Sequence, residues 1–145
     1  MFKTITPQEA SELLSGATGH VYLDVRSVAE FSAGHPVSAK NVPILEFDPD
    51  SGRWLPNERF LDVIEANFTK DTKIIVGCKS GGRSASACQV LVASGYKNLW
   101  NMDGGFAGRT EAGGRVAKPG WSTLGLPVEQ DAPEGSKYNA LAGNA

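Results

Sequence analysis

Hydrophobic residues recur along the chain with two different spacings, and these spacings predict alternating strands and helices. Short apolar runs with β-branched residues predict strands, and apolar positions three and four residues apart predict helices. Strands are predicted over residues 20–25, 74–77 and 99–102, with a brief one between 35 and 43. Helices are predicted over residues 7–14, 28–34, 57–68 and 83–94. This alternation indicates an α/β fold in which helices cover a mostly parallel sheet.

The starts of the predicted helices carry capping residues. Thr6–Glu9 and Ser27–Glu30 both have the sequence of a capping box, in which two side chains satisfy free N–H groups at the helix start. Pro7 occupies the first helical position, which proline tolerates. Asn57 is a candidate cap for the third helix.

Two stretches show no clear hydrophobic period. Residues 44–56 are expected to be irregular, with a turn at residues 48–52. Beyond Glu129 the chain is polar and contains proline and glycine, so we expect an extended or partly disordered segment.

One strand–loop–helix segment carries the most evident chemistry. Cys78 ends the strand, Gly81 and Gly82 allow the loop to curl with its N–H groups inward, and Arg83 opens the helix. A thiol reacts as its thiolate, and thiols at helix N-termini beside cations ionise more readily. With Lys79 as a second cation, the segment predicts an anion pocket with a reactive thiol at its floor.

The two cysteines have different surroundings in the sequence. Cys78 could be a buried structural residue, but two glycines and two cations beside it favour a nucleophile. Cys88 shares a helix face with Ala87 and Leu91, so we expect it in the core. The alternative role for Cys88 is a resolving partner of Cys78 in a thiol redox switch.

Cys78, Gly81, Arg83 and Ser84 fit the pattern Cys-x-x-Gly-x-Arg-Ser. This pattern resembles the active-site loop of the rhodanese family of sulfurtransferases. The resemblance implies that Cys78 takes a sulfane sulfur from a donor such as thiosulfate and passes it, through a persulfide, to cyanide or a thiol. It implies no metal and no organic cofactor, because the cysteine carries the sulfur. The implied substrate-binding residues are Lys79, Ser80, Gly81, Gly82, Arg83 and Ser84. Arg83 is also expected to close the loop by bonding to the loop carbonyls, and Ser84 is expected to be a helix cap or loop donor rather than a nucleophile.

Further segments resemble the same family in the same order. The N-terminal signature is matched by residues 23–26, 30–31, 34–35 and 39–43. Pro36 departs from it, because the family usually has an aliphatic residue after the histidine. The C-terminal signature is matched by Gly104–Phe106 and by residues 121–128.

The resemblance covers residues 1–129, which we predict to be one rhodanese-like domain followed by a polar C-terminal tail at 130–145. It implies a five-stranded sheet with helices on both faces. Residues 108–119 are an insertion relative to most relatives. This insertion is interpreted either as a solvated surface loop or as a rim that shapes access to Cys78 and attracts anions through Arg109, Arg115 and Lys118.

Charged residues near the N-terminal signature have less specific roles. Asp24 and Arg26 are expected to form a structural network at a strand end rather than to act as catalysts. Arg26 is expected to pair with Glu30 and so brace the short helix. His35 is a weak candidate for a general base, because it has no placed partner in the sequence.

Composition limits the partners and the compartment. The chain has 145 residues, 21% of them charged, which suits one globular domain. A net charge of −2 gives no general attraction to nucleic acid or membranes, and the N-terminus has no apolar run of signal-peptide or membrane-span length. We therefore expect a small anionic sulfur donor and a thiophilic acceptor as partners, with a protein acceptor as a further option. The thiolate chemistry favours the reducing cytoplasm.

Three other functions remain open from the residues alone. A rhodanese-fold phosphatase would have five residues between its cysteine and arginine, whereas four separate Cys78 from Arg83. An arsenate reductase would need a thiol relay, for which Cys88 is the candidate within the chain. A persulfide-relay or binding module would act only with a protein partner.

Overall fold

The computed structural model describes residues 1–145 and is built around one parallel sheet with the strand order β1-β8-β7-β2-β4. Its strands are β1 (Lys3–Ile5), β2 (Val21–Asp24), β4 (Lys40–Asn41), β7 (Lys73–Gly77) and β8 (Asn98–Met102). Strand β7 lies in the middle, and Ile74, Ile75 and Val76 are completely buried. A strand covered on both faces requires such a continuous apolar run.

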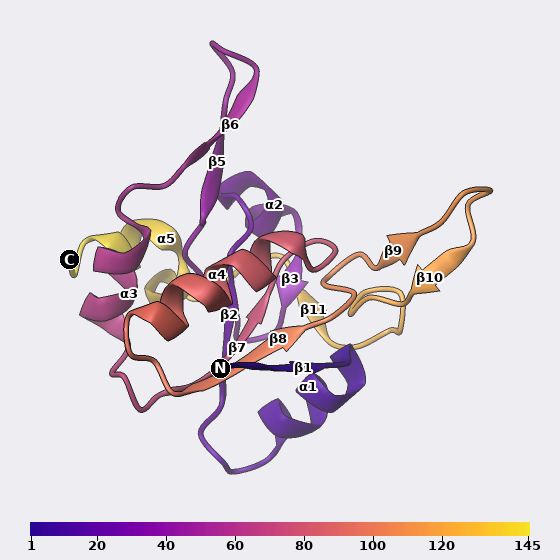
Figure 1. The fold of residues 1–145 in the computed structure, drawn as a ribbon, viewed down its shortest axis with the longest axis horizontal. Coiled ribbons are helices and arrows are strands. Elements are labelled where there is room, and N and C mark those ends of the chain that lie inside the picture. The colour runs from indigo at the N-terminus through magenta and orange to yellow at the C-terminus, as the bar shows by residue number, and fades with distance from the viewer.

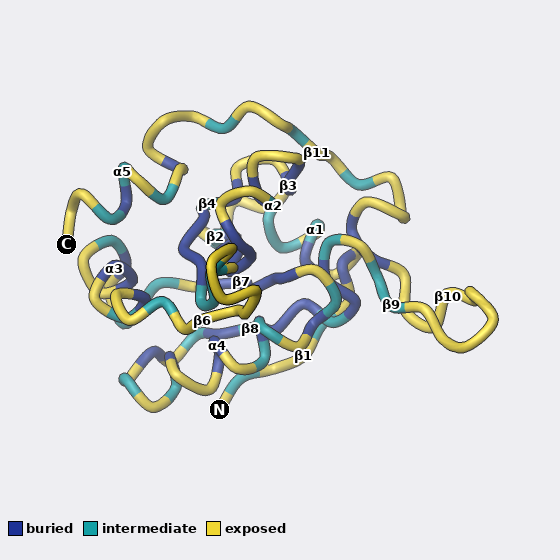
Figure 2. Tube along the Cα trace, turned by 90° about the horizontal axis from the view of Figure 1, so that it is seen from above, coloured by how far each residue is buried: buried dark blue, intermediate teal, exposed yellow.

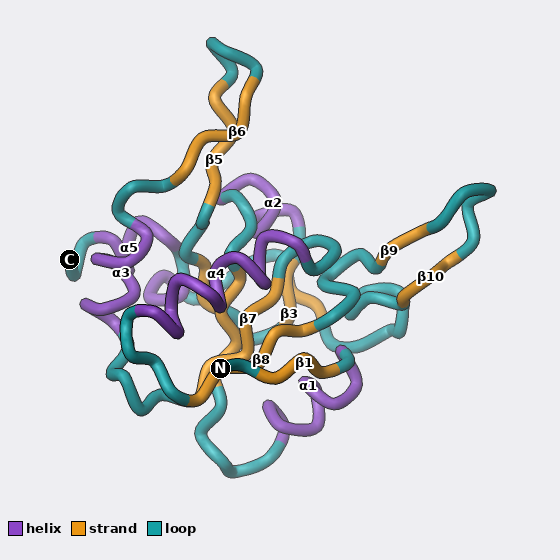
Figure 3. The backbone as a smooth tube through the Cα atoms, viewed as in Figure 1, coloured by secondary structure: helices purple, strands orange, loops and turns teal.

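Helices cover both faces of this sheet, as the sequence predicted (Figures 1 and 3). Residues of α1 (Pro7–Ser15) and α2 (Val28–Ala33) pack with Tyr22 and Ile75 on one face. Residues of α3 (Phe60–Asn67), α4 (Gly82–Ala93) and α5 (Tyr138–Ala142) pack with Leu23 and Val76 on the other. Neighbouring residues of one strand thus serve opposite cores, which follows from the two-residue period of a strand.

Both predicted capping boxes form, but the third helix starts later than predicted. The Thr6 hydroxyl accepts a hydrogen bond from the N–H of Glu9, and the Ser27 hydroxyl accepts one from the N–H of Glu30. Asn57 is not the cap of α3: its side-chain oxygen accepts the N–H of Arg59, 3.1 Å away, and the helix begins at Phe60. Asn57 therefore makes a turn that precedes the helix.

The expectation of an irregular stretch at residues 44–56 is wrong. β5 (Leu45–Asp48) and β6 (Arg53–Pro56) form an antiparallel hairpin around the expected turn, and this hairpin projects from the body of the protein (Figure 1). Phe47 faces Trp54 across the hairpin with ring centroids 5.5 Å apart, and such aromatic cross-strand pairs stabilise hairpins.

The insertion at residues 108–119 forms a second projecting hairpin. Its strands are β9 (Arg109–Thr110) and β10 (Val116–Lys118), and its tip is exposed (Figure 2). The sequence also gave no indication of β1, a three-residue strand at the sheet edge that pairs with β8. Strands this short carry too little hydrophobic pattern to be recognised.

The expectation that the segment after Glu129 is extended or partly disordered is also wrong. β11 (Val128–Glu129) pairs with β3 (His35–Pro36), and the chain continues into a 3₁₀ turn, η1 (Glu134–Ser136), and α5. Leu141 is 4% exposed and packs in the core beneath α3. A domain boundary at residue 129 stays a prediction. None of the helices has the length and hydrophobicity needed to span a membrane.

Candidate functional site

The thiol of Cys78 lies at the carboxyl end of β7, where the chain leaves the sheet. The residue is only 1% exposed. The N–H of Gly81 donates a hydrogen bond to its sulfur over 3.1 Å, and the Ser84 hydroxyl oxygen lies 3.4 Å from that sulfur. Gly81 has a φ of +119°, a conformation that favours glycine, so the loop geometry depends on this residue type. The arrangement suits a sulfur anion, because the Gly81 amide donor is aimed at it.

Helix α4 begins at Gly82, directly after the residue whose N–H donates to the thiol. The first helical backbone bond runs from the N–H of Ala85 to the carbonyl of Gly81, and the N–H groups of Gly82, Arg83 and Ser84 have no acceptor within the chain. Free N–H groups and the helix dipole together make an anion-binding position. Of the loop residues predicted from the motif, Gly81 and Ser84 contact the Cys78 sulfur, and the individual roles of all of them in binding remain predictions.

Asn101, near the end of β8, takes part in this site although no motif in the sequence pointed to it. The Ser84 hydroxyl lies 2.5 Å from the Asn101 side-chain oxygen and 3.1 Å from the Gly81 carbonyl oxygen. Ser84 is fully buried and Asn101 is 7% exposed. Their contact fixes the hydroxyl beside the Cys78 sulfur, and the role of Ser84 as a donor rather than a nucleophile stays a prediction.

The carbonyl groups on the outer side of the loop accept hydrogen bonds from residues 106–109, which hold the loop in place. The Cys78 carbonyl accepts the N–H of Phe106 at 2.7 Å, and the Lys79 carbonyl accepts the N–H of Ala107 at 2.9 Å. The Ser80 carbonyl accepts a bond from the Arg109 guanidinium at 3.1 Å. The Gly-Gly-Phe turn found in the sequence is therefore a support for the Cys78 loop.

Arg83 does not close the loop by bonding to the loop carbonyls, as the sequence suggested. Its guanidinium makes two hydrogen bonds to the Glu30 carboxylate, at 2.7 and 2.9 Å, and lies 5.4 Å from the ring centroid of Trp54. Burial would raise the pKa of Glu30, but the Arg83 bonds and the Ser27 donors outweigh it and lower that pKa to about 2. Glu30 therefore stays ionised and offsets much of the Arg83 charge.

Lys79 is the exposed cation of the loop. It makes no ion pair, in contrast to Arg83 and Arg109. Its ammonium group is therefore the free positive charge closest in sequence to the nucleophile, consistent with its predicted role toward an anionic donor.

Cys88 lies in the core, which confirms the expectation from its helix face. It is completely buried within the large hydrophobic cluster. Burial and the neighbouring charge of Cys78 raise the pKa of the Cys88 thiol to about 12. A thiol in this state is a poor resolving partner, because it is almost never ionised at neutral pH.

Asp24 and Arg26 form the expected structural network, but Arg26 does not pair with Glu30. Its guanidinium bonds the Asp24 carboxylate at 2.7 Å and the Gly34 carbonyl at 2.7 Å. His35 is completely buried, stacks on Phe31 and contacts the Phe31 carbonyl oxygen through its Nδ1 at 2.7 Å. These contacts tie β2 to α2 and give His35 a structural position.

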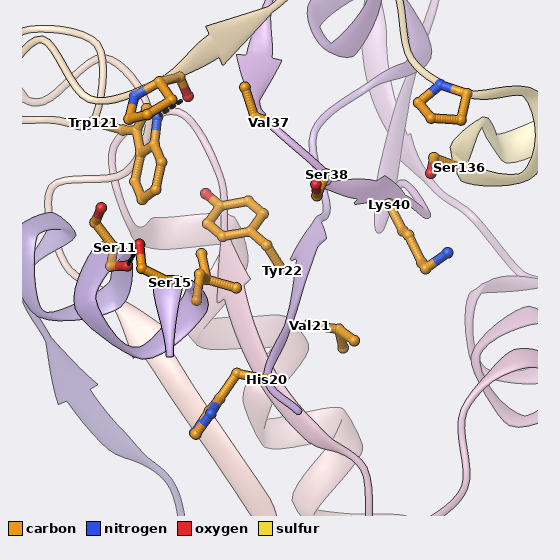
Figure 4. Close-up of a pocket in the computed structure, with 13 residues that line it drawn as sticks. Ser11, Ser15, His20, Val21, Tyr22, Val37, Ser38, Lys40, Trp121 and Ser136 are labelled. Carbon is orange, nitrogen blue, oxygen red and sulfur yellow. Dashed lines mark hydrogen bonds between the residues drawn. The ribbon is translucent and has the colours of Figure 1, made fainter. Parts of the chain in front are cut away.

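A separate cavity of about 590 Å³ opens on the α1 side of the sheet (Figure 4). Tyr22 and Trp121 lie in its wall with ring centroids 6.0 Å apart. Burial, with the charge of Asp24, raises the pKa of Tyr22 well above its ordinary range. Cys78 does not line this cavity, so the cavity is not part of the predicted site. No three His, Cys, Asp or Glu side chains are grouped closely enough to hold a metal ion.

Sequence comparisons agree with the fold. The family model described as "Rhodanese-like domain" matches residues 6–112. The chain is 39% identical, over 81% of its length and 67% of the relative's, to "Protein HIGH ARSENIC CONTENT 1, mitochondrial" from Arabidopsis thaliana. It is 40% identical to "Thiosulfate sulfurtransferase 18" from the same plant, over 71% of the chain and 74% of the relative. It is 37% identical to "Thiosulfate sulfurtransferase GlpE" from Haemophilus influenzae, over 88% of the chain and 95% of the relative.

Solved structures give the same picture. The crystal structure of Rv0390 from M. tuberculosis superposes with a TM-score of 0.72 and 29% identity, covering 90% of this chain and all of that one. A rhodanese-like domain protein from Staphylococcus aureus, at 24% identity and a TM-score of 0.59, shares the fold over 81% of this chain and all of that chain.

Proposed function

Because the chain belongs to the rhodanese-like domain family, we propose that it is a sulfurtransferase that moves a sulfane sulfur from thiosulfate or a similar donor to cyanide or a thiol. The observation that carries the proposal is the Cys78 sulfur, which accepts an amide hydrogen bond at the open N-terminus of α4. Relatives named thiosulfate sulfurtransferase at 37–40% identity support the same reaction class.

The reaction consists of two displacements at sulfur. The Cys78 thiolate attacks the outer sulfur of thiosulfate, and sulfite leaves with the electron pair of the broken sulfur–sulfur bond. The outer sulfur now belongs to a Cys78 persulfide. A nucleophilic acceptor attacks that sulfur, and the Cys78 thiolate leaves with the electron pair of the second bond. No electron carrier is required, because each bond broken is replaced by one formed.

The charged residues of the loop have separate tasks in this proposal. Lys79, which is exposed and unpaired, attracts the sulfite end of the donor. Arg83 contributes less than its motif position suggests, because the Glu30 carboxylate lies 2.7 Å from it. In this proposal, the free N–H groups at the start of α4 bind the negative charge that the donor brings to the thiol.

Intact-mass analysis tests the proposal directly. The purified protein is exposed to thiosulfate, the excess is removed, and the mass is measured before and after cyanide is added. We expect a product one sulfur atom heavier that returns to the original mass with cyanide, and no such product for Cys78→Ser. If thiosulfate and other sulfane sulfur donors leave the mass unchanged, the proposed function is wrong.

Arsenate reduction is a second candidate, favoured by the 39% identity to the relative whose name refers to arsenic content. Arsenate is a tetrahedral oxyanion, and the same amide donors suit it. The buried Cys88 is a poor relay thiol, so an external thiol such as glutathione would be the reductant. Arsenite formation with glutathione, measured beside thiosulfate turnover, decides between the two reactions. Aryl phosphates, offered in parallel, are expected to be turned over negligibly, because four rather than five residues separate Cys78 from Arg83.

The partners follow from the chemistry of the site. We propose a small anionic donor and a thiophilic acceptor, with a protein thiol as an acceptor option. A cytoplasmic location remains our proposal, since a thiolate nucleophile works in a reducing compartment.

A further inference from the structure

One peptide unit of the loop is held from both sides. The N–H of Gly81 donates to the Cys78 sulfur at 3.1 Å, and the carbonyl of the same peptide, on Ser80, accepts from the Arg109 guanidinium at 3.1 Å. The N–H and C=O of a peptide point in opposite directions. A donor that fixes the carbonyl on the outside therefore aims the N–H at the sulfur on the inside.

Arg109 completes a series of donors that the backbone begins. The carbonyls of Cys78 and Lys79 accept the N–H groups of Phe106 and Ala107. The next N–H, of Gly108, bonds the Gly104 carbonyl at 2.8 Å and is not available to the loop. The third loop carbonyl, on Ser80, is thus satisfied by a side chain from the insertion hairpin.

The guanidinium is itself held in place. The same Arg109 nitrogen lies 2.7 Å from an Asp103 carboxylate oxygen, and that oxygen also accepts the N–H of Gly104. Burial would raise the pKa of Asp103, but Arg109 and Lys118 outweigh it and lower that pKa. The Arg109 side chain is 41% exposed, so solvent moderates its contribution.

We propose that Arg109 is a positioning residue for the sulfur-transfer reaction: it fixes the Ser80–Gly81 peptide so that the Gly81 N–H donates to the Cys78 thiolate and persulfide. Gly81 has a φ of +119°, and as a glycine it would also tolerate a rotated Ser80–Gly81 peptide. Such a rotation would turn the Ser80 carbonyl toward the sulfur. The bond from Arg109 opposes that rotation, and its positive charge strengthens the amide as a donor. The role in transfer rests on the proposed function, whereas the effect on the Cys78 thiol does not.

Alkylation of Cys78 by iodoacetamide, followed by mass spectrometry across pH, measures this effect without any sulfur donor. For Arg109→Ala we expect alkylation at pH 6 to be about threefold slower and the midpoint of the pH profile to move upward by about half a pH unit. Arg109→Lys should restore part of the rate, because an ammonium can still donate to the Ser80 carbonyl. Arg115→Ala removes the same charge near the exposed tip of the same hairpin and should match the parent protein.

Apart from Asp103, which loses the Arg109 guanidinium in Arg109→Ala, the charged and ionisable groups near the thiol keep their partners in these variants. They are Lys79 on the loop, Arg83 on α4 with Glu30 on α2, Tyr22 and Asp24 on β2, and Cys88 on α4. A difference between Arg109→Ala and Arg115→Ala is therefore assigned to the hairpin contact. Equal profiles for these two variants would overturn the proposal, as would a slowed profile that Arg109→Lys does not improve.

Two further measurements separate the possible failures. Thermal unfolding of each variant shows whether Arg109→Ala is folded, and if it is not, Arg109→Lys and Asp103→Asn are compared with Arg115→Ala instead. Turnover with thiosulfate and cyanide should fall about threefold in kcat with little change in KM for Arg109→Ala. If the parent protein forms no persulfide while Arg109→Ala still shifts the alkylation profile, the proposed function fails and the positioning role stands.

Discussion

Two arginine–carboxylate pairs flank the Cys78 loop, and they act on it differently. On one side, here named the α2 flank, Arg83 pairs with Glu30 at 2.7 Å. On the other, the β8–β9 flank, Arg109 pairs with Asp103 at 2.7 Å. The α2 flank neutralises a loop side chain, whereas the β8–β9 flank bonds three consecutive loop carbonyls. One flank therefore adjusts the charge at the site and the other fixes its backbone geometry.

Removing the nucleophile should have the largest effect, because both flanks act through its sulfur. Cys78→Ser should reduce sulfur transfer to background, since a serine hydroxyl is not ionised near neutral pH. Steady-state assays with thiosulfate and cyanide check this. Cys88→Ala is the matched control and should keep its turnover while losing about 1–2 kcal/mol of unfolding free energy. Residual activity above a few per cent in Cys78→Ser, or an inactive but folded Cys88→Ala, would contradict these assignments.

Adding a side chain where the β8–β9 flank meets the loop should destabilise the protein and slow sulfur transfer. Gly105 has a φ of +63°, and an added Cβ would lie 2.5 Å from the Lys79 carbonyl carbon and 2.6 Å from the Cys78 carbonyl oxygen. Gly105→Ala should therefore cost about 3 kcal/mol of unfolding free energy, measured by urea denaturation. Gly113→Ala has a similar φ of +88° with no neighbour within 4 Å, so it should lose only about 1 kcal/mol. Equal losses would mean that the close approach to the loop is not what matters.

The free charge of the loop should affect binding of the donor. Lys79→Ala should raise the KM for thiosulfate about fivefold, equivalent to about 1 kcal/mol for an exposed cation near an anion. Neutral persulfide donors should be less affected. A similar loss for charged and neutral donors would exclude an electrostatic cause.

Releasing Arg83 on the α2 flank should give the smallest change, with opposite signs for binding and stability. Glu30→Gln removes the countercharge and should lower the KM for thiosulfate about twofold. Because the pKa of Glu30 is depressed to about 2 from 4.5, its stabilisation is complete above about pH 4.5 and is lost as the pH falls toward 2. After allowance for solvent screening, this amounts to about 1 kcal/mol.

Unfolding free energies of the parent protein and Glu30→Gln at pH 7 and pH 3 check this behaviour. The two proteins should differ most at pH 7 and converge in acid. A difference that persists unchanged at the lowest pH would show that the Glu30 charge is not responsible.

The sequence allowed correct prediction of features encoded by local residues. The capping boxes at Thr6 and Ser27, the buried run at Ile74–Val76 and the Cys78 loop each depend on residues close together in the chain. Side-chain partners could not be predicted in the same way. Arg83 lies 53 residues from Glu30, and Arg109 lies 29 residues from Ser80. Only the folded sheet brings these segments together, because β2, β7 and β8 end at the same edge.

Weak local patterns account for the remaining errors. The sequence of the five-residue α5 resembles that of a polar tail. The helix is stabilised by Leu141, which lies in the core, and by the Asn67 side chain, which donates a hydrogen bond to the Leu141 carbonyl at 2.9 Å. The β5–β6 hairpin was missed because both strands are largely exposed, so no face alternates with a core. The Asp103-Gly104-Gly105 turn is the one sequence signal that could have pointed to the support of the loop.

The near-complete burial of Cys78 has a consequence for selectivity in the proposed reaction. With 1% of the residue exposed, a donor must deliver a slender terminal atom to the floor of the site. Once loaded, the transferable sulfur projects one bond further outward than the thiol sulfur did. In the proposed reaction, the width of the donor molecule therefore limits the first half-reaction. The acceptor attacks a sulfur that lies further from Cys78, so the second half-reaction admits bulkier nucleophiles. In the proposed reaction, the site around Cys78 would therefore select donors by their width more strictly than acceptors.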